Sequence, residues 1–431
     1  MDLWGITWTA LALVLFPFGY KPMLFLLVMS SIFQGSSALS MGALNIPLSP
    51  FIECLFIARL CLPMEGKGFV NLKNKKILVA LLWIVIIWGY SYLSANLFSG
   101  LRVFSSLQSF ELNFVTNGMP LRWSGANLNQ LVILTTHILT LSLIYYRREE
   151  IDKSYFLNCI LITLLVFVGI CIVWKVFPAV YAALSLLIFN NTSYSVTALY
   201  EGRVSGTFVE PSLAGLYICT FAVPLLCAKN KLYKILGIGC VLVFTLNLST
   251  SGLFTLVISA PIVFIILFRK TIQNYFLSTF VLVIMTLAIM PVINLFSKYA
   301  AQKSSSDSGL MRGAANLNAF ENIFNTYGFG LGVGSERASS LLITIINNFG
   351  IGISLVLVLY GCRLFKNRNK NSDVNKLLIT FFAVSFFGSF SANPEYTLAF
   401  MWVLLYACVV KGGASEFVVE KKSHQSRSHT Q

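Results

Sequence analysis

Residues 77–98 read ILVALLWIVIIWGYSYLSANLF, a stretch without a charged side chain that directly follows the basic residues Lys73, Lys75 and Lys76. A helix needs about 20 consecutive apolar residues to cross the hydrocarbon core of a bilayer. Similar segments recur along the whole chain, and none has the strict alternation of a transmembrane β-strand. Because the backbone in lipid must satisfy its own hydrogen bonds, such segments form helices. The sequence therefore predicts an all-α polytopic integral membrane protein.

Composition supports this class. Of the 431 residues, 57% are hydrophobic and 11% are charged, whereas soluble domains have about a quarter charged residues. The nine cysteines lie in or beside apolar segments and form no CxxC or Cys/His metal spacing, so we expect packing residues and no metal site. The first apolar segment is too long and too poorly flanked for a cleaved signal peptide.

Hydropathy divides the chain into about 12–13 predicted spans. They cover residues 3–20, 22–40, 46–63, 77–98, 127–146, 155–178, 208–227, 235–250, 252–268, 274–296, 337–362, 377–392 and 395–410. Only the break Ser249-Thr250-Ser251-Gly252 separates two of them, which leaves a hairpin open as an alternative to two crossings. Residues 1–411 then form a single transmembrane domain, and the polar residues 412–431 form a disordered cytoplasmic tail.

The distribution of positive charge predicts the orientation of these spans. Most of the 31 Lys and Arg residues lie in one alternating set of connections. That set includes Lys73, Lys75, Lys76, Arg147, Arg148, Lys153, Lys229, Lys231, Lys234, Arg363, Lys366, Arg368 and Lys370. The positive-inside rule makes this set cytoplasmic and places the long connections 99–126, 179–207 and 297–336 outside. The net charge of +15 is thereby explained without a nucleic-acid partner.

The first group of charged residues in the predicted outer loops precedes span 208–227. Arg203 and Glu210 stand on either side of a short Gly/Ser segment, and Pro211 follows. Proline suits the first turn of a helix, so Glu210 is expected at a helix N-terminus, where the dipole stabilises a carboxylate. Glu210 is then either a helix-start acid or an acid that faces a cavity, and Arg203 is either a headgroup anchor or a site residue.

The second group lies in the 297–336 connection. Asp307 and Arg312 come first, and the run Tyr327-Gly328-Phe329-Gly330-Leu331-Gly332-Val333-Gly334 leads to Glu336 and Arg337. No strand precedes the glycine run and no Lys-Ser/Thr follows it, so it is not a nucleotide P-loop. It is either a hinge or part of an anion site, because arginine pairs bidentately with phosphate.

Ionisable residues within the predicted spans are few. Glu53 and Arg59 lie six positions apart on different faces of one helix, so they do not pair with each other. Arg59 is expected to extend its guanidinium to the interface. His137 is interpreted as a hydrogen-bonded packing residue rather than a ligand.

The two charged groups resemble the motifs of a known family. The pattern Arg203-x-x-Gly206-x-Phe208-x-Glu210-Pro211 is similar to the Arg-x-x-Gly-x-Phe-x-Glu-Pro-Asn motif of the bacterial O-antigen polymerase/O-antigen ligase superfamily, with Ser212 in place of Asn. The Ser/Gly break at 249–252 resembles that family's Ser-x-Ser-Arg-Gly, without its arginine. Arg312, the Gly-x-Gly-x-Gly element and the segment Asn347–Gly352 resemble its large outer loop and the helix that follows.

This resemblance implies a GT-C-like fold and a polysaccharide polymerase in the bacterial inner membrane, with its active site facing the periplasm. Donor and acceptor would be undecaprenyl-diphosphate-linked glycans, transferred without metal or cofactor, and a chain-length regulator is left open as a partner. Catalysis would fall to Arg203, Glu210 and Arg312, with Asp307 and Glu336 as substitutes for the base. The diphosphate would be bound by Arg203, Arg312, Arg337, Gly330 and Gly332.

One departure separates the branches of this family. Ligases and some polymerases have a His-Asn pair just after the glycine element, where this chain has Ala338-Ser339-Ser340-Leu341. This favours a polymerase over a ligase. The alternative from another class is a flippase or other transporter, which would show similar halves and ionisable groups near the midplane. The chain shows no likeness between its halves.

Overall fold

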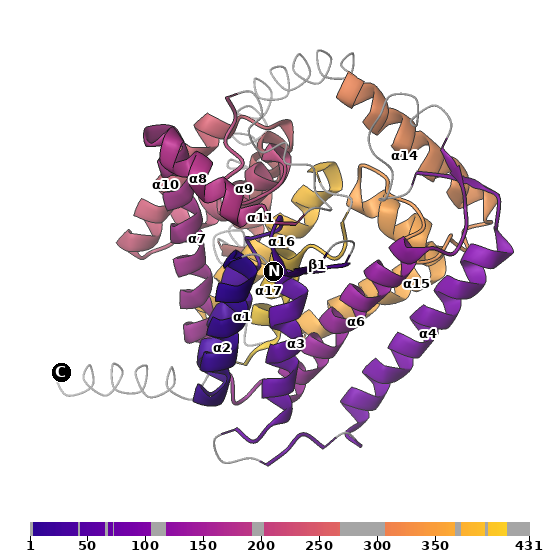
Figure 1. Ribbon diagram of the computed structural model, residues 1–431, viewed down its shortest axis with the longest axis horizontal. Coiled ribbons are helices and arrows are strands. Elements are labelled where there is room, and N and C mark those ends of the chain that lie inside the picture. The colour runs from indigo at the N-terminus through magenta and orange to yellow at the C-terminus, as the bar shows by residue number, and fades with distance from the viewer. Residues whose placement is uncertain are drawn as a thin grey trace, which may run out of the picture.

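The structure, a computed structural model, describes residues 3–41, 44–64, 68–71, 73–104, 118–191, 202–267, 307–366, 372–392 and 395–411. This part of the chain is mostly helical (Figure 1). Its helices are α1 (Leu3–Leu15), the 3-10 helix η1 (Phe16–Phe18), α2 (Tyr20–Ser30), α3 (Leu48–Cys61), α4 (Lys75–Leu97), α6 (Gly125–Tyr146), α7 (Lys153–Val176), α8 (Pro178–Ile188), α9 (Pro211–Leu226), α10 (Lys231–Asn247), α11 (Thr250–Leu267), α14 (Asp307–Asn325), α15 (Leu341–Lys366), α16 (Asp373–Ala392) and α17 (Ala399–Val409).

Six of the described helices, α4, α6, α7, α11, α15 and α16, are long and apolar enough to cross a membrane. Their outward faces are apolar: Leu82 is 59% exposed, Val85 68% and Leu359 60%. Buried positions instead include many Ser, Thr and Asn side chains. Large apolar side chains thus cover the outside of the bundle as well as its core, unlike the surface of a water-soluble globule. The helical, membrane-embedded class predicted from the sequence is confirmed.

The helix connections gather at two opposite ends of the bundle. At one end, which we call the basic end, Lys153 donates to Asn375 (2.6 Å), Lys411 pairs with Glu149 (2.7 Å) and the Arg147 guanidinium donates to the carbonyls that follow α3. We call the opposite end, with α8 and α14, the site end; Figure 1 shows α14 at the top and the connection between α3 and α4 at the bottom. The predicted grouping of basic connections therefore matches their arrangement in space.

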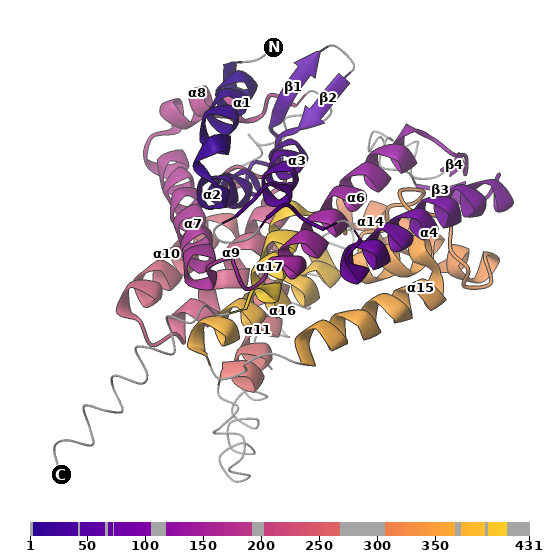
Figure 2. The ribbon, with the colours of Figure 1, turned by 90° about the horizontal axis from the view of Figure 1, so that it is seen from below.

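Helix α9 lies at the centre of the bundle. Nearly all its residues are buried, and α10, α11 and α16 pack around it (Figure 2). The α10–α11 connection is Leu248-Ser249, with Leu248 at φ 41°, and the other residues of the predicted break, Thr250 to Gly252, form the first turn of α11. A Cβ at Gly215 of α9 would lie 1.9 Å from Ser249 Oγ, so this glycine allows the break to pack directly on α9. The tip of this α10–α11 hairpin is at the site end, and α11 is itself long and apolar enough to cross a membrane.

Three predictions about segment boundaries need correction. The span predicted at 22–40 ends at Ser30, because the Gly35-Ser36 turn leads into a two-stranded antiparallel sheet of β1 (Ser37–Met41) and β2 (Leu44–Pro47). The predicted loop 179–207 begins with α8, and the predicted loop 297–336 contains α14. The loop at 99–126 contributes a small second sheet, β3 (Arg102–Val103) with β4 (Met119–Pro120).

Span 274–296 and tail 412–431 lie outside the described residues.

Candidate functional site

The segment 202–210 is a tightly held loop in front of α9. Phe208 is fully buried against Phe167, Tyr217 and Phe400. The Asn247 side chain, at the tip of the α10–α11 hairpin, donates to Val204 O (2.5 Å) and Pro211 O (2.8 Å). The apolar and glycine residues of the motif therefore fix the conformation of the loop. The two charged residues of the motif, Arg203 and Glu210, do not contribute to this packing.

Those two residues, Arg203 and Glu210, are more accessible than the rest of the loop. Arg203 is exposed and forms no ion pair with any carboxylate in the described part of the chain. Glu210 is half-buried at the N-cap of α9, as predicted, and one of its carboxylate oxygens accepts from Ser212 Oγ at 2.9 Å.

The glycine run 328–334 is a packed loop rather than an open cradle. The N–H of Gly330 donates to Thr326 Oγ1 (3.2 Å), and those of Leu331 and Gly332 donate to the carbonyls of Asn347 and Asn348. A Cβ at Gly330 (φ +93°) would lie 2.5 Å from Gly350 N. Because their N–H groups are already used, Gly330 and Gly332 have no backbone donor left for a diphosphate, and we correct that assignment.

Glu336 holds α14 against this loop. Its carboxylate, 3% exposed, accepts from Asn318 (2.5 Å), from Asn322 (2.9 Å) and from the Asn347 amide of α15. Burial raises the pKa of Glu336 to about 7, against the lowering effect of these three amides. Both oxygens are engaged, so this carboxylate serves as an anchor between α14 and α15.

Arg312 lies one helical turn before Asn316, whose side chain accepts from Ser339 N at 2.8 Å. Residues four apart share a helix face, so Arg312 and Asn316 are on the side of α14 that packs towards 336–339. Arg312 is half-buried there. Asp307 begins the same helix, and its side chain is outside the described set.

Of the three candidate site arginines, Arg337 has a carboxylate partner within the described residues. Its guanidinium lies 3.3 Å from Glu395 Oε1, and the amide of Gln34 donates to Glu395 Oε2 at 3.3 Å. Gln34 belongs to the turn at 31–36, where Ile32 O accepts from Thr207 of the Arg203 loop (2.6 Å). The two motif segments, far apart in the chain, therefore meet at one short turn.

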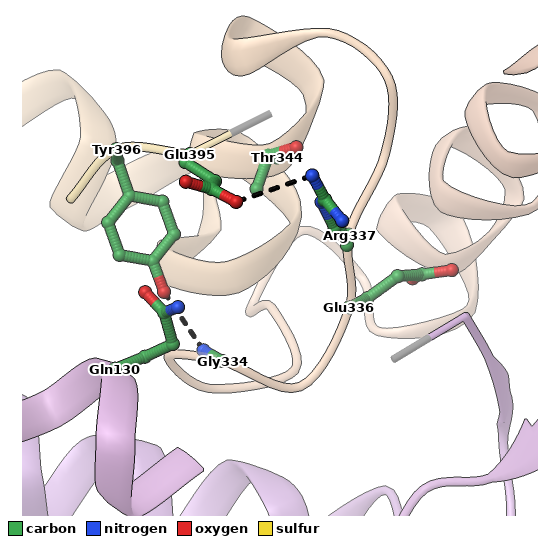
Figure 3. Close-up of a pocket in the computed structure, with 7 residues that line it drawn as sticks. All are labelled: Gln130, Gly334, Glu336, Arg337, Thr344, Glu395 and Tyr396. Carbon is green, nitrogen blue, oxygen red and sulfur yellow. Dashed lines mark hydrogen bonds and ion pairs between the residues drawn. The ribbon is translucent and has the colours of Figure 1, made fainter. Parts of the chain in front are cut away.

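A small cavity of about 30 Å³ opens beside the Arg337–Glu395 pair. Figure 3 shows its lining: Gln130, Gly334, Glu336, Arg337, Thr344, Glu395 and Tyr396. In that view Arg337 reaches towards Glu395, whereas Glu336 points the other way.

A second cluster of ionisable groups is buried between α3, α6 and α17. His137 Nδ1 lies 2.8 Å from Glu53 Oε2, and both side chains are 1% exposed. Tyr406 OH donates to Glu53 Oε1 (2.5 Å), and Trp402 stacks on the imidazole at 4.8 Å between centroids. The structure thus gives His137 the hydrogen bonds that the sequence interpretation expected, and it pairs Glu53 with a residue of another helix.

Sequence reasoning missed Gln34 and Glu395. The available signal for Glu395 was a carboxylate at the first position of the otherwise apolar predicted span 395–410. In the described ranges, no three His, Cys, Asp or Glu side chains group as metal ligands.

Comparison of the chain with protein-family models, curated proteins and solved structures finds no match in any of the three.

Proposed function

We propose that this protein polymerises lipid-diphosphate-linked oligosaccharide repeat units into O-antigen or a related surface polysaccharide. The reaction takes place on the periplasmic face of a bacterial inner membrane, crossed by about 13 helices. The donor glycan leaves undecaprenyl diphosphate and is transferred to the end of a second lipid-linked glycan. No metal ion takes part.

One observation carries this proposal: the loop that follows Arg203 and, through Glu395, the side chain of Arg337 both reach the turn 31–36 at the end opposite the basic connections. The leaving group is a lipid diphosphate, whose charge must be met where the glycosidic bond breaks. Exposed Arg203 and half-buried Arg312 and Arg337 provide permanent positive charge for it. Glu210 is the carboxylate that the motif itself contributes.

A flippase for the same lipid-linked glycan is a second candidate, supported by the buried Glu53–His137 pair. Ionisable groups inside a membrane often mark transport pathways. A ligase is less well supported, because the chain has Ala338 and Ser339 where ligases have His-Asn.

The test is gel analysis of surface polysaccharide from a deletion strain complemented with wild type, Arg203→Ala or Arg312→Ala. We expect both variants to lose the long-chain ladder while single repeats stay attached to the lipid core. Arg122→Ala is the matched control, since Arg122 is an exposed arginine outside both motifs. A full ladder in both arginine variants would remove the proposed roles.

Loss of every repeat in the deletion strain would contradict the polymerase. Lipid-linked units accumulating in the inner leaflet would then indicate the flippase, and accumulation in the outer leaflet would indicate the ligase.

A further inference from the structure

The segment Glu395–Thr397, between α16 and α17, is fixed from three sides. Tyr396 OH accepts from Gly334 N (3.0 Å), and Trp402 Nε1 donates to Tyr396 O (2.7 Å). Thr397 donates to Gln130 of α6 (3.0 Å), and His137 Nε2 lies 3.2 Å from Thr397 O. Glu395 is therefore presented by a backbone with little freedom to move, which a reacting group requires.

The cavity beside Glu395 has an unsatisfied polar group in its wall. Thr344 is 2% exposed, and within the described residues its Oγ1 has no hydrogen-bond partner. A buried hydroxyl without a partner is destabilising, so a ligand that supplies the missing bond is favoured. The volume of about 30 Å³ fits one water-sized polar group, such as a sugar hydroxyl.

We propose that this cavity is the subsite for the attacking hydroxyl of the acceptor glycan, and that Glu395 accepts its proton. This inference rests on the proposed polymerase function. The acceptor oxygen bonds to the anomeric carbon of the donor, and the bond from that carbon to the diphosphate oxygen breaks. The bonding pair leaves with the lipid diphosphate, and the hydroxyl proton passes to a Glu395 oxygen and then to water.

The Arg337–Glu395 pair makes proton transfer depend on donor binding. Its 3.3 Å separation is longer than the 2.7–2.9 Å typical of charge-assisted bonds, and the side chains are 24% and 21% exposed. Such a pair exchanges partners easily. A diphosphate offers Arg337 more negative charge than one carboxylate does. Donor binding therefore draws Arg337 away from Glu395 Oε1, and this oxygen takes the proton while Gln34 stays on Oε2.

Other carboxylates near this site are less suited. Glu336 points away from the cavity and its two oxygens are held by amides at 2.5–2.9 Å, whereas Arg337 and Gln34 each lie 3.3 Å from the Glu395 oxygens. Glu210 does not line the cavity. Glu321 of α14 is exposed and does not line the cavity.

The experiment uses the full chain in detergent with a purified undecaprenyl-diphosphate-linked repeat unit. We expect Glu395→Gln to lower kcat by ~10²–10⁴-fold with little change in the donor KM. Formate should partly restore Glu395→Ala, because a small carboxylate can occupy the vacated space. Thr344→Val should raise the acceptor KM, and Glu321→Gln, the matched control, should behave like wild type.

Each failure has its own meaning. Wild-type protein that makes no polymer would overturn the proposed function, and this inference with it. Wild-type polymerisation with a fully active Glu395→Gln would overturn the inference alone. Restoration of Glu210→Ala by formate would also overturn the inference, since Glu210 would then be the base. An inactive Glu395→Ala that formate does not restore and that has a raised donor KM would overturn it as well, because Glu395 would then only hold Arg337.

Discussion

The molecule contains two buried glutamates whose surroundings differ. Glu53, between α3, α6 and α17, has a histidine at 2.8 Å and a tyrosine hydroxyl as partners. Glu336, at the site end, has three asparagine amides as partners and, within the described part of the chain, no ion pair with a cation. The first is held by an imidazole and a phenol inside the helix bundle, and the second is an acid surrounded by neutral donors.

This difference separates two ways of holding helices together. An ion pair is weakened most by removing one partner, because the other charge is then left without compensation. An acid among neutral amides responds to pH, because no nearby cation favours its charged form. We therefore expect mutation to affect the Glu53 cluster most, and pH to affect the Glu336 cluster.

The largest expected effect is that of His137→Leu. It leaves Glu53 buried with only Tyr406 as a partner, and breaking a buried pair in this way costs about 3–5 kcal/mol. The measurement is thermal unfolding in detergent, monitored through a thiol dye that reacts with buried cysteines such as Cys219 and Cys240 when unfolding exposes them. The double variant Glu53→Leu/His137→Leu should unfold closer to wild type. Equal stability of His137→Leu and wild type would show that the pair contributes nothing.

How far the sequence predicts this molecule depends on the range of the interaction. The helical membrane class, a break at Ser249 and the start of α9 at Pro211 follow from local composition and are found, although residues 250–252 of the predicted break belong to α11. Helix α14 is missed because its polar face, with Asn318 and Asn322, gives it a loop-like composition. Its stability comes from Glu336, a contact that hydropathy does not detect.

The candidate site shows the same division. Arg203 and Glu210 stand out in the sequence as motif residues, and Arg337 as part of the charged group after the glycine run. Glu395 and Gln34 belong to segments with no motif, and they come close to Arg337 only when α2 and the α16–α17 connection fold together. The pairing of Glu53 with His137 also depends on helices that are distant in sequence.

The second prediction concerns pH. Burial raises the pKa of Glu336 from 4.5 to about 7, so the folded state holds the proton more tightly than the unfolded state. The protonated group stabilises the fold fully below about pH 4.5, and this contribution falls as pH rises and is lost above about pH 7. The difference corresponds to about 3 kcal/mol.

The measurement is the unfolding temperature between pH 5 and 8 for wild type and Glu336→Gln. We expect the wild-type value to fall with pH relative to that of the variant, since glutamine does not titrate. In the described part of the chain, Asn347 Oδ1 has no partner, so it can accept from a protonated Glu336 after an amide flip. Parallel curves for the two proteins would contradict a raised pKa.

The smallest expected effect is the loss of one amide from the Glu336 cluster. Asn318→Ala removes the donor to Glu336 Oε1 but leaves Asn322 and Asn347 on the other oxygen, so we expect α14 to loosen by about 1–2 kcal/mol. Amide hydrogen exchange in α14 and in residues 327–340 measures this directly. Asn325→Ala is the matched control, because its bond to Asn322 is weak at 3.4 Å and does not reach Glu336. If the two variants exchange equally fast, Glu336 does not anchor α14; if only Asn318→Ala exchanges faster, the amide cluster fixes the helix that carries Arg312.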